Sequence, residues 1–158
     1  MSLQSLARLS ELRLQAAERV LAAARHALAI AEQGILDAQA AEADLARRLD
    51  TQRDTIREAF VGSSQARVAV EEMLREFQSF DAAIAAAAER TAEAIATRDA
   101  AKPPVAEART AVLKADTARR KRVHLVTKIT RDAARVAELT EAAEAEEQWA
   151  STRQGGNP

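Results

Sequence analysis

The sequence predicts an all-α fold: a long antiparallel two-helix coiled-coil hairpin with a short helical tip and a break at Pro103-Pro104. Hydrophobic residues recur every 3.5 positions, the spacing that keeps one face of a helix against a partner. The chain has 40 alanines but only four glycines and three prolines among its 158 residues, a composition typical of long helices. No alternating pattern of polar and apolar residues bounded by turns predicts a strand.

The predicted first helix covers about residues 3–60, and Ser2 or Ser5 can cap its start. Steps of three and four residues define two sets of seam positions along it. Many of the second set are alanines, whose small side chains allow a close approach of two backbones. The sets are Leu14, Leu21, Leu28, Ile35, Glu42, Leu49, Ile56 and Ala17, Ala24, Ala31, Ala38, Leu45, Gln52, Ala59.

Two breaks divide the rest of the chain. Gly62-Ser63-Ser64 interrupts the pattern, and Ser63 or Ser64 can cap a new helix. Residues 61–81 then form the tip, with a possible turn at 78–81. The second long helix covers about 82–150 and is kinked near 103, because proline lacks a backbone donor and restricts its predecessor. Residues 1–152 form one elongated hairpin, and residues 153–158 are expected to be a disordered tail.

The register depends on where the chain reverses, which the sequence leaves open between Gly62 and Phe80. If the chain reverses near Phe80, the sequence numbers of two residues that face each other across the seam add up to roughly 161–165. Glu42 then faces Arg119 or Arg122, and these three form a polar layer that fixes the register. The same seam can also pair between two chains, so an intramolecular hairpin and a dimer both remain open.

The sequence contains none of the residue patterns that are typical of catalytic sites. The chain has no cysteine, and its two histidines, His26 and His124, lack partners at metal-ligand spacing. It has no glycine-rich phosphate loop, and its net charge of −1 with few aromatics argues against nucleic-acid binding. No segment approaches the roughly 20 apolar residues that span a bilayer. We therefore expect a soluble cytoplasmic protein that is not an enzyme and holds no cofactor or metal.

Three features have both a functional and a structural interpretation. The basic run Arg119–Arg122 is either a docking surface or a solvated face matched to acidic residues on the first helix, such as Glu32, Asp37, Glu42 and Asp44. A stripe at helical spacing is either the core under the tip or an exposed patch that binds a partner. Trp149 is expected to pack against Leu9, Leu12 or Leu14. The stripe consists of Phe77, Phe80, Ile84 and Ala87.

The chain resembles the FliJ/YscO family, the central-stalk proteins of flagellar and virulence type III secretion systems. Three stretches carry the resemblance. They are the N-terminal LARLSELRLQAAERVLAAARHALAIAE, the mid-chain EEMLREFQSFDAAI, and the basic AVLKADTARRKRVHLVTKITRDAARVAEL, which precedes an acidic end.

The resemblance implies a rod whose termini insert into the hexameric export ATPase and promote its assembly and activity. It also implies contact with the cytoplasmic domain of the export gate, and with secretion chaperones in some members, at the periphery of the membrane-embedded apparatus. Whether the system is flagellar or virulence-related stays open. The alternative is a structural coiled coil or dimerisation module without an ATPase partner. The implied gate contacts are Phe77, Phe80, Ile84 and Ala87, and the ATPase pore contacts are Arg8, Arg13, Arg131 and Arg135.

Overall fold

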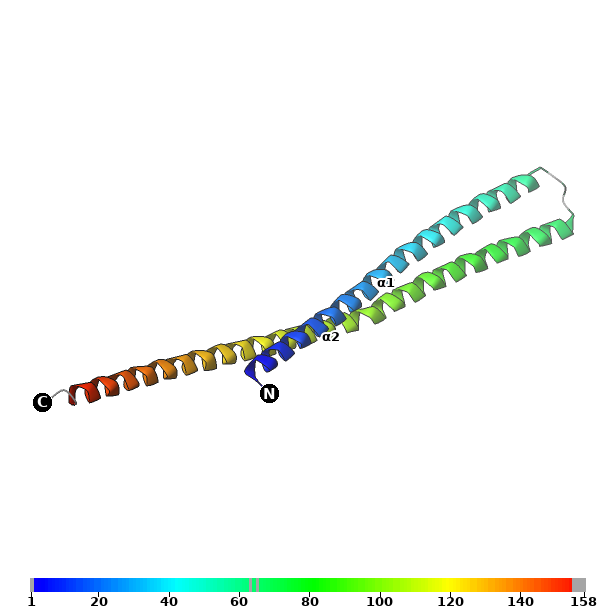
Figure 1. Cartoon of the computed structure of the whole chain (residues 1–158). Helices are drawn as coiled ribbons and strands as arrows, with labels where there is room; N and C mark the ends of the chain where they lie inside the picture. The colour runs from blue at the N-terminus through cyan, green and yellow to red at the C-terminus, as the bar shows by residue number, and fades with distance from the viewer. Residues whose placement is uncertain (1, 63, 65, 155–158) are drawn as a thin grey trace. The chain divides into compact units, whose positions relative to one another are not determined.

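The computed structural model of the chain describes residues 2–62, 64 and 66–154, and these form two long α-helices. Helix α1 spans Leu3–Phe60 and helix α2 spans Arg67–Gln154 (Figure 1). No strand occurs among the described residues. The all-helical prediction is therefore confirmed, and the arrangement is consistent with a helical hairpin.

The ends of α1 follow local rules. The Ser2 hydroxyl accepts a hydrogen bond from the Ser5 amide at 3.1 Å, so Ser2 is the N-cap. Gly62, two residues beyond the last helical residue, has φ +76°, a left-handed conformation that glycine adopts without a steric penalty. The chain reverses between Phe60 and Arg67, and Ser63 lies outside the described residues.

Helix α2 is continuous across both positions where the sequence predicted an interruption. The turn at 78–81 and the break at Pro103-Pro104 were wrong, since both segments lie inside α2. Alanine-rich sequence of high helix propensity flanks the prolines. Just beyond them, Val105 and Ala108 are only 7% and 4% exposed. Packing of these two side chains stabilises the helix where the prolines remove two backbone donors.

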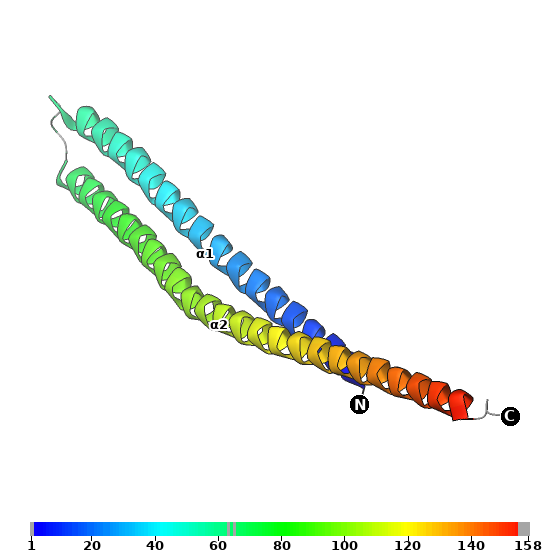
Figure 2. The same ribbon diagram turned by 90° about the vertical axis from the view of Figure 1, so that its left-hand side faces the viewer.

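Residue contacts divide the chain into two units. The tip unit is Val20–Arg109, in which the C-terminal part of α1 lies beside the N-terminal part of α2 (Figures 1 and 2). Arg53 pairs with Asp81, and Glu42 pairs with Thr91, so the numbers of paired residues sum to 134 and 133. The register expected from a reversal near Phe80 was therefore wrong, because the chain reverses before Arg67.

The seam predicted for α1 is largely the face that the tip unit covers. Ala31 and Leu49 are buried, and most other seam residues in this unit are half-buried. Near the tip the covered face moves by one residue, because Arg53 and Phe60 are half-buried whereas Gln52 and Ala59 are exposed. In α2 the covered face repeats every three or four residues: Met73, Phe77, Phe80, Ile84, Ala87, Thr91, Ala94, Arg98, Ala101, Val105 and Ala108.

The terminal unit consists of Met1–Arg19 and Thr110–Pro158. Residues 4–11 of α1 and 119–126 of α2 line a common groove. Ser10, 2% exposed, donates a hydrogen bond to the Ala7 carbonyl at 2.6 Å. Beyond Val126, every described residue of α2 through Arg153 is exposed. This part of the helix, the orange-to-red end of α2 in Figures 1 and 2, has no neighbouring helix within its unit.

Candidate interaction surfaces

Two polar pairs join α1 to α2 in the tip unit. The Thr91 hydroxyl donates a hydrogen bond to the Glu42 carboxylate at 2.7 Å. The Arg53 guanidinium donates to the Asp81 carboxylate and also lies 5.6 Å from the centre of the Phe77 ring. Because a shift of one helical turn would break both pairs, they specify the register of the helices.

The polar layer of Glu42, Arg119 and Arg122 is not a feature of either unit. Glu42 belongs to the tip unit, where its hydrogen-bond partner is Thr91, and the arginines belong to the terminal unit. Arg119 instead pairs with Asp116 at 3.2 Å on its own helix. The expected layer followed from the wrong register, and Thr91 was missed because an isolated threonine on a helix carries no distinctive spacing.

Half of the basic run Arg119–Arg122 is neutralised within α2. Asp116 binds Arg119 and also Arg120, the latter at 2.8 Å. Partial burial raises the pKa of the Asp116 carboxyl, but hydrogen bonds from Arg119 and Arg120 lower it, and the net pKa lies below its ordinary value. The acidic partner of these two cations therefore lies on α2 and not, as expected, on the first helix. Lys121 and Arg122 form no ion pair in the described part of the chain.

The phenylalanine stripe belongs to the covered face of the tip unit. Phe80 and Ala87 are 7% and 6% exposed, while Phe77 and Ile84 are half-buried. The Phe77 and Phe80 rings lie 6.2 Å apart in a tilted arrangement, and Arg57 lies 5.8 Å from the Phe77 ring. These contacts agree with the core interpretation, and the export-gate contact stays a prediction.

The four predicted pore-contact arginines all lie in the terminal unit. Arg8 and Arg13 are exposed on α1, and Arg131 and Arg135 are exposed on α2. Arg8 lines the groove between the two helices together with Val123. Across residues 2–62, 64 and 66–154, none of these four arginines forms an ion pair, so each guanidinium is available to a partner.

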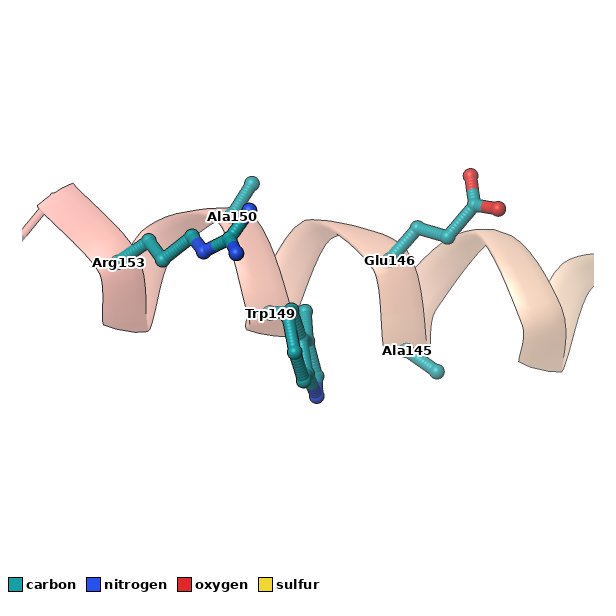
Figure 3. Close-up of a pocket in the computed structure, with 5 residues that line it drawn as sticks. All are labelled: Ala145, Glu146, Trp149, Ala150 and Arg153. Atoms are coloured by element: carbon teal, nitrogen blue, oxygen red, sulfur yellow. The ribbon is translucent and has the colours of Figure 1, made fainter.

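Trp149 does not pack against the leucines of α1 as expected. It is 70% exposed, and its ring stacks with the Arg153 guanidinium at 5.3 Å (Figure 3). Figure 3 also shows the ring projecting from a helix whose neighbouring side chains, Ala145 and Ala150, are small. The indole is therefore a large apolar surface on the unpaired part of α2, a feature the sequence pattern did not indicate.

The described residues show surfaces for contact and no group that binds a metal. No cluster of three potential metal ligands occurs among them. Neither helix, over the same residues, contains a stretch long and apolar enough to cross a membrane. Comparison with known proteins identifies no matching family model, curated protein or solved structure.

Proposed function

We propose that this chain is a non-enzymatic antiparallel coiled-coil hairpin that acts as the central stalk of a type III export ATPase. In this role it inserts into the hexamer, promotes its assembly or activity, and links it to the cytoplasmic domain of the export gate. Secretion chaperones are further partners. The site of action is cytoplasmic, beside the membrane-embedded export apparatus.

The observation that carries the proposal is the set of unpaired cations in the terminal unit. Arg8, Arg13, Arg131 and Arg135 are exposed, and none has an acidic partner among the described residues. A slender helical element that presents cations is suited to a channel lined by carboxylates, where charge attraction accelerates association. The paired residues and the three-four repeat of covered positions support the antiparallel coiled coil.

The experiment measures ATP hydrolysis by the purified export ATPase with increasing amounts of this protein. We expect the rate and the hexamer fraction to rise to a plateau. More of the variant Arg131→Ala/Arg135→Ala than of the parent should be required to reach the plateau. This difference between variant and parent should become smaller as the salt concentration rises, because salt screens the charge attraction. Arg75→Ala is the matched control, because Arg75 is exposed and unpaired but lies in the tip unit.

Saturating protein that changes neither assembly nor hydrolysis would refute the stalk proposal. If the double variant and Arg75→Ala act alike, the pore assignment of the arginines fails while the stalk proposal stands. The gate contact has its own test. Phe80→Ala/Ile84→Ala should weaken binding to the gate domain while the helix content is retained.

A second candidate is a structural coiled coil that pairs between chains without an ATPase. One observation favours it: the seam of α2 continues past Val126 on residues that are exposed within the described part of the chain. An unchanged ATPase together with a self-associating chain would select this candidate.

A further inference from the structure

The C-terminal part of α2 has an apolar face without a partner. We call residues 127–153 the arm; at about 1.5 Å per residue it is roughly 40 Å long. Ile129, Val136 and Leu139 are 44%, 63% and 64% exposed. Large aliphatic side chains repeated along one exposed face indicate a surface that another helix covers.

The arm continues the seam that is covered in the rest of α2. Covered positions of the terminal unit run Val112, Ala115, Arg119, Arg122 and Val126 in alternating steps of three and four. The same alternation, extended past Val126 without a change of phase, gives Ile129, Ala133, Val136, Thr140, Ala143, Glu147 and Ala150. The arm therefore has the pattern of a two-stranded contact, and α1 covers this seam only as far as Val126.

The charges of the arm are segregated along its length. The first third carries Lys128, Arg131 and Arg135 with one acidic residue, Asp132. Residues 138–147 carry five glutamates and no basic residue. Across the described ranges of the chain, no charged side chain of the arm forms an ion pair. Each block is thus open to a partner of opposite charge.

We infer that the arm pairs with the arm of a second copy in antiparallel orientation. In a parallel pair the two acidic blocks would lie side by side at an interaxial distance of about 8–10 Å, close to the Debye length of about 8 Å at physiological salt, so salt would screen their repulsion only in part. Reversing one arm places each acidic block beside the basic block of the other copy. Charge therefore favours the antiparallel pair and opposes the parallel one.

The seam also supports antiparallel pairing. Aligning Val136 of each copy with Thr140 of the other brings Ala133 opposite Ala143, and Ile129 opposite Glu147, on each side of the centre. Alanine opposite alanine allows the helices to approach closely. In this register residues 128–135, which hold the basic block, lie level with residues 141–148 of the second copy, which hold four of the five glutamates. The match occurs twice because the interface is symmetric.

The inference concerns the purified chain alone and does not depend on the ATPase proposal. Its first test is the mass in solution, measured by light scattering over a range of concentrations. We expect the mass to rise toward twice the 17.1 kDa of one chain. A chain that stays monomeric at every accessible concentration overturns the inference, and a higher oligomer overturns it as well.

Cysteine pairs test orientation and register. The chain has no native cysteine, so each introduced thiol is a unique reporter. Ala133→Cys and Ala143→Cys replace exposed residues and leave the folded core unchanged. Oxidation of the mixed variants should give the 133–143 disulfide between copies, whereas each variant alone should give little. Efficient cross-linking of Ala133→Cys to itself indicates parallel arms and overturns the inference.

A matched pair of lysine substitutions tests the seam. Val136→Lys places a charge at the centre of the proposed contact and should weaken the dimer at least about tenfold. Ala145→Lys adds the same charge to the arm off the seam and should leave the dimer intact. Both positions are exposed in the single chain, so helix content should be unchanged in both variants. Equal effects of the two substitutions would show that the seam is not the interface.

Discussion

Replacing Pro103 and Pro104 with alanine should stabilise this protein. A helix interior pairs each N–H with the carbonyl four residues earlier, so these prolines leave the carbonyls of Asp99 and Ala100 without their usual donors. Both proline rings are exposed, and removing them costs no buried contact. A single interior proline costs about 3 kcal/mol relative to alanine. We expect Pro103→Ala/Pro104→Ala to gain at least about 3 kcal/mol, because neighbouring substitutions need not add.

Urea unfolding followed by far-ultraviolet circular dichroism measures this gain, and thermal unfolding should show a rise of roughly 6–12 °C. The glycine variant Pro103→Gly/Pro104→Gly is the control. It restores both donors, but each glycine costs about 1 kcal/mol relative to alanine, so its gain should be smaller by about 2 kcal/mol. An alanine variant that is no more stable than the parent would refute the reasoning, because it would mean that the prolines end the helix.

Three further predictions concern stability. Thr91→Val should lower the free energy of unfolding by about 1 kcal/mol, because it removes the hydrogen bond to Glu42. A double-mutant cycle with Glu42→Ala should show a coupling energy of at least about 0.5 kcal/mol. Additive effects of the two substitutions would contradict the hydrogen bond. Arg53→Ala should lower the free energy of unfolding by about 1–2 kcal/mol, because it removes an ion pair and a cation–π contact. The control Arg75→Ala should change this free energy by no more than about 0.5 kcal/mol. Equal losses for the two variants in urea unfolding would argue against the cross-helix pair. The folded-state pKa of Asp116 is depressed, so its stabilising contribution is present above the unfolded value of 3.8 and is lost as pH falls through the folded pKa. Asp116→Asn should therefore flatten the acid side of the stability profile slightly, and an unchanged profile would contradict the assignment.

Much of the helical content followed from sequence because it depends on local and periodic signals. The seam from Leu14 to Leu49 coincides with covered positions, and the expected cap at Ser2 is present. Gly62 was recognised as one of two possible positions for the reversal. The choice between them could not be made locally, because residues 78–81 resemble a turn in composition while their backbone is helical. Burial of Phe80 against the partner helix outweighs weak local signals there.

The candidate surfaces were less predictable than the helices. The register between two regular seams is nearly degenerate, since sliding by seven residues preserves most apolar contacts. The partner of Glu42 therefore depended on the position of the reversal, and an error there displaced every expected pair. Trp149 was expected to pack against Leu9, Leu12 or Leu14 near the start of α1. It lies instead on the arm, which α1 does not reach.

The sequence alone determines that this chain is helical, where its seam lies, and that its charges form blocks near the C-terminal end. These properties are set by neighbours within a few residues, through propensity, capping and the repeat of 3.5. Only the tertiary structure decided which seam residues meet, that Arg53 and Thr91 fix the register, and that α2 continues through Pro103-Pro104. The physical reason is that a repeating seam permits several pairings of similar energy, and the few cross-helix polar contacts and buried side chains select one of them.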